Sequence, residues 1–240
     1  MFPSTDWGLF ESVRGKDTAA RNCALEVLAT RYWRPVFLFI RQHGCDTADA
    51  EDLAQEFFAT WLAKDTFAKA DSVKGRFRCL LQASIKRFLA NVARDRRAKR
   101  RMPPRGFLSI QELAEADGPV VEPFHNETPE AIFDRAWAVT LVTRVLRHLE
   151  GESRETGKTA HFDIFRHRIV QPLLNGTEPP PMKELAQRHG IDEKQAANAF
   201  LTARRAYQRL LRDEIRLYAN SEDEVSAEVR DIFRALQRGQ

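Results

Sequence analysis

The sequence has little cysteine, and this shortage excludes several kinds of protein. Its 240 residues contain only three cysteines, Cys23, Cys45 and Cys79. They are odd in number and widely separated, so no pair has the spacing of a disulfide framework or a zinc site. The six histidines are scattered and form no pattern that completes a metal site. We therefore expect reduced thiols in a reducing compartment, with no metal and no other cofactor.

Long hydrophobic runs are also missing. The longest run, residues 36–40, is far too short to cross a bilayer. The first ten residues lack the basic start and apolar stretch of a secretory signal. We therefore expect a soluble, cytoplasmic protein that does not enter a membrane.

The alternating pattern of β-strands is absent as well. Nearly every periodic segment has the helical period, and no internal repeat is visible, so the sequence predicts an all-α fold. The charge balance is mildly basic, with 38 Lys and Arg against 34 Asp and Glu. Because this excess is small, the distribution of charge along the chain is more informative than the sum.

A change of composition divides the chain into two helical domains. Prolines, glycines and acids replace helical periodicity in residues 102–128, which predicts a flexible linker. Before it, Pro35 predicts a kink or short break in a helix over 24–42. The expected organisation is an N-terminal segment 1–19, a helical domain 20–101, the linker 102–128, a helical domain 129–217 with a helix-turn-helix, and a tail 218–240.

The second domain has a strong helix start. Thr128 is suited to the N-cap, Pro129 to the first helical position and Glu130 to the first turn. Apolar side chains then recur at every fourth position and predict one buried face. These residues are Phe133, Trp137, Leu141, Val145 and Leu149.

An acidic helix is predicted around the stretch "AEDLAQEFFATWL", residues 50–62. Asp49, Asp52 and Glu56 share one side of it, with Gln55 beside them, and bulky apolar residues occupy the other side. No Lys or Arg stands at the helical spacings that would pair these acids. Three interpretations follow: an ordinary solvated face, a surface for a basic partner, or a paired-carboxylate site that requires a nucleophile or metal nearby.

A basic helix is predicted from residue 77 to residue 101. Its apolar stripe faces one way, and basic side chains lie on the other side. Seven Lys and Arg residues stand between Arg94 and Arg105, against the single acid Asp95. This density exceeds what solubility requires and indicates phosphate binding with a salt-sensitive affinity.

The sharpest local motif is a helix-turn-helix at residues 182–211. Gly190 suits the tight turn, and Asp192 with Gln195 forms a near capping box for the second helix. Ala196 and Ala199 are small enough for two helices to cross closely. In such units the second helix enters the major groove of DNA, although a plain helical hairpin has the same pattern.

Together these pieces resemble the extracytoplasmic-function sigma factors of bacterial RNA polymerase, which keep only regions two and four. The resemblance covers roughly residues 20–217. It is carried by "RYWRPVFLFIRQHGCDTADAEDLAQEFFATWL", "KGRFRCLLQASIKRFLAN" and "FDRAWAVTLV", which look like a planctomycete-type branch. The recognition helix departs from many relatives at residues 196–198, and His189 stands where an apolar residue is usual.

The resemblance implies a role for each surface. The acidic helix would dock on the coiled coil of the polymerase's largest subunit through Asp49, Asp52, Gln55 and Glu56. The basic helix would recognise the minus-ten element and its melted strand through Lys86, Arg87, Asn91, Arg94 and Arg97. The helix-turn-helix would bind double-stranded minus-thirty-five DNA through Lys194, Asn198, Thr202, Arg204 and Arg205. Such proteins are not enzymes, and an anti-sigma factor commonly holds them.

Two rival functions remain open from the sequence. A free-standing helix-turn-helix regulator would bind DNA without polymerase, but it leaves the acidic helix without a role. A helical hydrolase or metalloenzyme would use the carboxylates and predicts a bound metal. The tail at 218–240 suits either packing on the second domain or binding a regulator.

Overall fold

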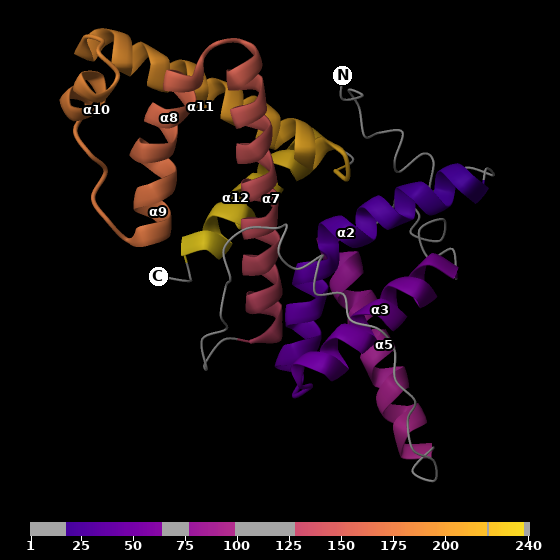
Figure 1. Ribbon diagram of the computed structural model, residues 1–240. Helices are drawn as coiled ribbons and strands as arrows, with labels where there is room; N and C mark the ends of the chain where they lie inside the picture. The colour runs from indigo at the N-terminus through magenta and orange to yellow at the C-terminus, as the bar shows by residue number, and fades with distance from the viewer. Residues whose placement is uncertain (1–17, 64–76, 99–127, 220, 238–240) are drawn as a thin grey trace. The chain divides into compact units, whose positions relative to one another are not determined.

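The fold is all-α. The computed structural model describes residues 18–63, 77–98, 128–219 and 221–237, and these contain helices but no β-strand, which confirms the predicted fold class (Figure 1). The predicted linker, 102–128, lies almost entirely outside the described residues. The helices are α2 (Thr18–Gln42), α3 (Thr47–Ala63), α5 (Phe77–Ala98), α7 (Pro129–Glu155), α8 (Thr159–Phe165), the π-helical turn η1 (Arg166–Val170), α9 (Gln171–Asn175), α10 (Met182–Arg188), α11 (Glu193–Arg216) and α12 (Glu222–Gln237).

The chain forms two compact units. Unit 1 takes the described residues up to Thr140 and those from Ile215 onward, and unit 2 takes Leu141–Glu214. The division therefore runs through α7 and α11, whereas the second domain expected from the sequence spans 129–217. The start of α7 belongs to unit 1 because it is buried on nearly every side, including Phe133 and Trp137.

The core of unit 1 is rich in aromatic side chains. It joins residues of α2, α3, α5 and the start of α7, with Phe39, Phe57 and Leu81 almost fully buried. The rings of Tyr32 and Trp137 stack with their centroids 4.5 Å apart, within the range that favours aromatic pairs.

Of the kink or short break predicted at Pro35, the break is not present, since α2 is one helix from Thr18 to Gln42. A proline inside a helix removes one backbone hydrogen bond and costs about 3 kcal/mol. Val36, Phe39 and Ile40, which follow it, are 0% exposed. Their burial in the core offsets this cost and keeps the helix continuous across the proline.

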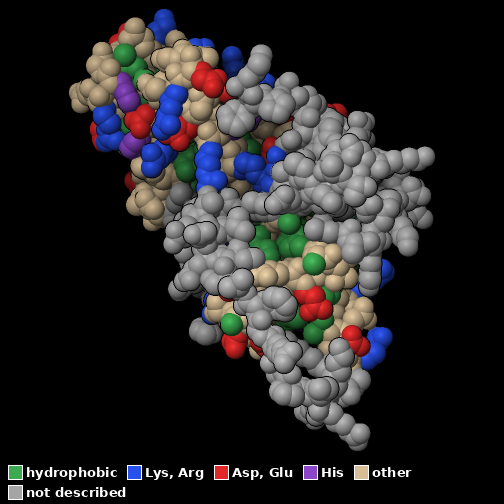
Figure 2. Space-filling view, turned by 45° about the vertical axis from the view of Figure 1, so that its right-hand side comes forward, with side chains coloured by type: hydrophobic (Ala, Val, Ile, Leu, Met, Phe, Trp, Pro, Cys, Tyr) green, Lys and Arg blue, Asp and Glu red, His purple; other side chains and the backbone are tan. Residues whose placement is uncertain are grey.

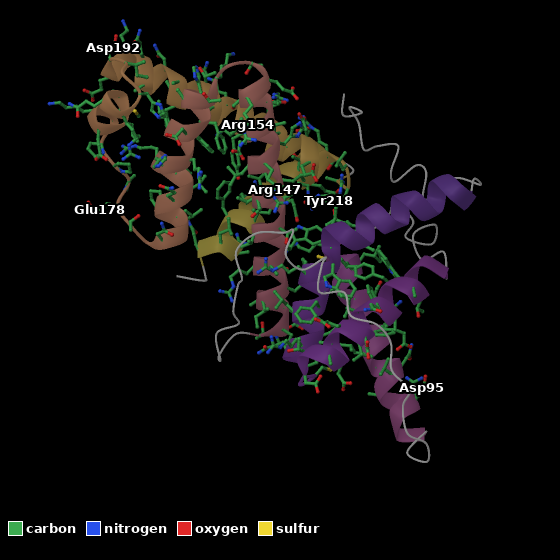
Figure 3. The ribbon with its side chains drawn as sticks, viewed as in Figure 1. Asp95, Arg147, Arg154, Glu178, Asp192 and Tyr218 are labelled. Atoms are coloured by element: carbon green, nitrogen blue, oxygen red, sulfur yellow. The ribbon has the colours of Figure 1, made fainter. Side chains whose placement is uncertain are left out.

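The tail forms helix α12 in unit 1. Val225 and Ile232 bury the apolar side of α12 and are 1% and 2% exposed. Tyr218, just before it, places its ring against Phe77 and Trp137, with centroids 6.0 and 5.8 Å apart (Figure 3). The sequence left open whether this segment packs on the second domain or binds a regulator, and the structure assigns its packing to unit 1.

Unit 2 is built from the second part of α7 with α8–α11. Leu141, Val145 and Leu149 continue the pattern of an apolar residue at every fourth position of α7, and all three are buried, as the sequence predicts. At the other end of α7, which belongs to unit 1, Thr128 caps the helix, because its hydroxyl accepts a hydrogen bond of 3.2 Å from the Ala131 amide. Phe165 lies against Tyr207 of α11, with ring centroids 5.2 Å apart.

Candidate functional site

The predicted acidic surface lies on α3. Asp46 caps this helix by accepting a hydrogen bond of 2.7 Å from the Asp49 amide. The carboxylates of the predicted set, Asp49, Asp52 and Glu56, are exposed, and Gln55 is half-buried. On the other side, Leu53, Phe57 and Trp61 are at most 5% exposed and belong to the core of unit 1. Asp52 and Glu56 form no ion pair with any residue that the structure describes.

The predicted basic surface lies on α5. Lys86, Arg87, Asn91 and Arg94 are all exposed, while Leu81 and Ile85 are buried at the back of the same helix. Arg97 is within α5, but its side chain lies outside the described residues, as does the rest of the basic run. The part of α5 that is described therefore has the two sides that the sequence predicts.

Lys86 forms an ion pair with Glu130 of α7. Its Nζ lies 2.6 Å from Glu130 Oε1, and the two side chains are 50% and 42% exposed. The hydrogen bond from Lys86 is the main reason that the pKa of Glu130 is lowered. One turn back along α5, Gln82 donates to Asp134 with a separation of 2.9 Å. Sequence reasoning missed these pairs because the partners are far apart in the chain.

The same row of contacts ends in a buried cluster around Arg78. This guanidinium lies 2.5 Å from Asp134, 3.3 Å from Glu228 and 3.2 Å from Asp231. Burial lowers the pKa of Arg78, but the attraction of Glu228 and Asp134 outweighs burial and raises it above its ordinary value. Arg78 and Glu228 are only 8% and 1% exposed, so this cluster holds α5, α7 and α12 together.

The predicted helix-turn-helix segment places α10 and α11 on either side of a short connection. Gly190 in that connection has a φ of 64°, a conformation that favours glycine. Asp192 lies at the start of α11 (Figure 3). It accepts from the Gln195 amide at 2.7 Å, and the Gln195 side chain accepts from the Asp192 amide at 3.0 Å, which is the predicted capping box.

Small residues bring α11 close to its neighbours. Ala196, Ala199 and Ala203 are at most 4% exposed, and the first two pack in a cluster with Leu185 and Ala186 of α10. An alanine has little bulk, so the helices approach closely at these positions. The buried side of α11 is therefore a stripe of alanines, and everything opposite that stripe faces outward.

His189 is held by a carboxylate of α8. Its Nε2 lies 2.8 Å from Asp163 Oδ2, and the same Asp163 lies 3.3 Å from Nδ1 of His167. His189 is the residue just before Gly190. A polar link to α8 therefore fixes this end of α10.

The outward side of α11 carries most of the predicted DNA-binding residues. Lys194, Asn198 and Arg205 are exposed and follow one line opposite the buried alanines. Arg204 and Thr202 are also exposed but lie on opposite flanks of that line. Figure 2 shows that basic side chains on the visible part of unit 2 are mixed with acids and histidines. The candidate surface is thus narrow rather than a broad basic patch.

Two features of this helix were not expected from the sequence. The hydroxyl of Thr202 donates to the Asn198 carbonyl at 2.8 Å, and Thr202 lines a cavity of about 380 Å³ with residues that include Ser153, His161 and Arg209. Leu201, which was not among the predicted contacts, is 43% exposed in the middle of the outward face. The spacing of Leu201 from Lys194 and Asn198 was the signal that could have identified it.

Comparison with known proteins identifies no relative. No protein-family model matches the chain, no curated protein matches it, and no solved structure matches it. Among the described residues, no group of three or more His, Cys, Asp or Glu side chains is arranged to hold a metal ion. None of the described helices combines the length and apolar character required to cross a membrane.

Proposed function

We propose that the protein is a sigma factor, which binds core RNA polymerase in the cytoplasm and directs promoter recognition and transcription initiation without catalysing a reaction itself. The observation that carries the proposal is the two-sided character of α3. One side is buried in the core of unit 1, and the other exposes Asp52 and Glu56 with no described cation to pair them. A basic partner surface would neutralise these charges, and the sequence resemblance makes the polymerase coiled coil that partner.

The basic side of α5 supports a DNA-binding role for the same unit. Arg87, Asn91 and Arg94 are exposed on the side of the helix away from the core. Cations placed in this way bind phosphates, and the amide of Asn91 offers both a donor and an acceptor to a base. Recognition of the minus-ten element and its melted strand is the function that this arrangement supports.

The exposed line on α11 supports a second DNA contact through the major groove of the minus-thirty-five element. Lys194 and Arg205 supply positive charge, and Asn198 has the geometry to read adenine. Held on one polymerase, two weak DNA contacts reinforce each other through their effective concentration. Strong binding by either surface alone is therefore unnecessary.

The test is co-elution of the full chain with core polymerase on a sizing column at moderate salt. A variant with Asp52→Arg and Glu56→Arg should lose the complex because its surface then repels a basic partner. A second variant, Glu155→Arg with Glu178→Arg, is the matched control, since it makes the same change of net charge at two exposed residues of unit 2. It should co-elute as the unchanged chain does.

The same experiment separates the free-standing regulator from the sigma factor. A folded chain that binds duplex DNA but never co-elutes with polymerase would move the function to the regulator. Loss of the complex in both charge-reversed variants would mean that net charge, rather than the acidic side of α3, drives association.

A further inference from the structure

Leu201 lies at the centre of the outward face of α11. Residues three and four apart share a helix face, so Lys194, Asn198, Leu201 and Arg205 follow one line along it. Leu201 is 43% exposed, which leaves much of a large apolar side chain in water between two cations. A partner that fits this line is negatively charged at both ends and offers an apolar group in the middle.

The neighbouring Thr202 does not offer a hydrogen-bond donor at this point. Its hydroxyl donates to the carbonyl of Asn198 within the helix, with a separation of 2.8 Å. Asn198 therefore carries the nearest uncharged side chain on the line that offers both a hydrogen-bond donor and an acceptor. Two uncharged side chains on this line are therefore left to contact base edges: the amide of Asn198 and the apolar side chain of Leu201, three residues further on.

We propose that Leu201 contacts the 5-methyl group of thymine in the major groove and that Asn198 reads an adjacent adenine, so that α11 selects A·T base pairs. This inference rests on the proposed DNA-binding role of α11. Thymine is the one base whose major-groove edge presents a methyl group, and asparagine pairs with the N6 and N7 atoms of adenine. Lys194 and Arg205 hold the phosphates on either side and position the helix.

The experiment replaces thymine by uracil, which differs only in lacking the methyl group. A duplex preferred by the full chain in complex with core polymerase is first selected from random sequences. Each thymine is then changed to deoxyuridine in turn. At one or two positions uracil should weaken binding by about fourfold, the change expected when burial of one methyl group is lost.

Two variants assign this effect to a side chain. Leu201→Ala should bind the thymine and uracil duplexes equally well, because the group that contacts the methyl is gone. Ile169→Ala should keep the full discrimination, since it removes a similarly exposed apolar side chain of unit 2 that lies outside α11. Thermal unfolding of both variants should match that of the unchanged chain, as expected for substitutions at exposed positions.

Several outcomes would overturn the inference. If no uracil substitution affects binding, α11 does not read a thymine methyl, although polymerase binding and promoter selection would leave the proposed function intact. If Leu201→Ala keeps the discrimination, another residue reads the methyl. If the chain selects no duplex even with polymerase, both this inference and the proposed function fail.

Discussion

At the scale of single residues, Arg78 and Lys86 show how burial changes the contribution of an ion pair to the stability of the fold. Both are cations of α5 that contact acids of α7. Arg78 is 8% exposed and faces three carboxylates, whereas the side chain of Lys86 is 50% exposed and faces one. Removing one partner of a buried pair leaves an uncompensated charge in the interior, while an exposed pair contributes little because water screens it.

We therefore expect Arg78→Met to destabilise unit 1 by about 3–5 kcal/mol. Lys86→Met, the matched control on the same helix, should cost at most about 1 kcal/mol. Urea unfolding followed by tryptophan fluorescence measures both, because Trp61 and Trp137 are buried in the core of unit 1 and residues 141–240 contain no tryptophan. Equal losses in the two variants would contradict the structural role assigned to the Arg78 cluster.

Tyr207 provides a pH-dependent prediction for unit 2. Burial raises the pKa of its hydroxyl from about 10 to about 12, since the charged form is poorly solvated there. A group whose pKa is raised by folding stabilises the fold fully below its unfolded pKa. That contribution is lost as the pH rises from 10 to 12 and amounts to about 2–3 kcal/mol.

Tyr207→Phe should therefore lose less stability than the unchanged chain between pH 10 and pH 12. Unfolding in urea, followed by far-ultraviolet circular dichroism across this range, compares the two proteins. An absorbance titration should also lose one tyrosinate step near pH 12 in the variant. Parallel stability curves would show that Tyr207 ionises as freely in the folded chain as in the unfolded one.

At the scale of elements, α7 both packs in the core of unit 1 and pairs its acids with polar and basic side chains of α5. Its acids Glu130 and Asp134 are four residues, or about one helical turn, apart. Glu130 contacts Lys86, and Asp134 contacts Gln82 and Arg78. These three residues of α5 also follow one another at intervals of about one turn. The carboxylate of Glu130 thus pairs with Lys86, a cation that would contact DNA in the proposed minus-ten surface. Phosphate and Glu130 compete for the same ammonium group.

Glu130→Gln should strengthen binding of single-stranded DNA by the full chain. Releasing Lys86 adds about one phosphate contact, so the slope of log affinity against log salt should steepen by about 0.7 for a single strand. Glu155→Gln makes the same charge change at an exposed position of unit 2 and should leave the slope unaltered. An identical gain in both variants would show that Glu130 acts only through net charge.

At the scale of the whole molecule, the proposed function combines three surfaces on two units. Acids of α3 and cations of α5 lie on unit 1, and the line through Asn198 and Leu201 lies on unit 2. Each surface is small, and the cations of α5 are partly neutralised by α7. Under the proposed function, useful promoter affinity therefore requires the polymerase to hold both units near one DNA molecule. The unassisted chain should bind duplex DNA weakly, and its affinity should rise when polymerase is added.

The features that the sequence determined by itself are local ones. The capping box of Asp192 and Gln195, the Thr128 cap and the two sides of α3 all depend on residues within four positions of one another. Helical geometry brings such residues together whatever the rest of the chain does. For the same reason the sequence predicted part of the exposed line of α11, namely Lys194, Asn198 and Arg205. Leu201 was not predicted, because the sequence alone does not show that this leucine is exposed.

The tertiary structure decided the contacts between residues that are distant in the chain. Gln82 meets Asp134 from 52 positions away, Arg78 meets Asp231 from 153, and His189 meets Asp163 from 26. No local spacing encodes these pairs, because they follow from how helices pack around a shared core. That packing also kept α2 unbroken at Pro35, placed α12 in unit 1 and gave Lys86 a partner, since the burial of apolar side chains outweighs local preferences.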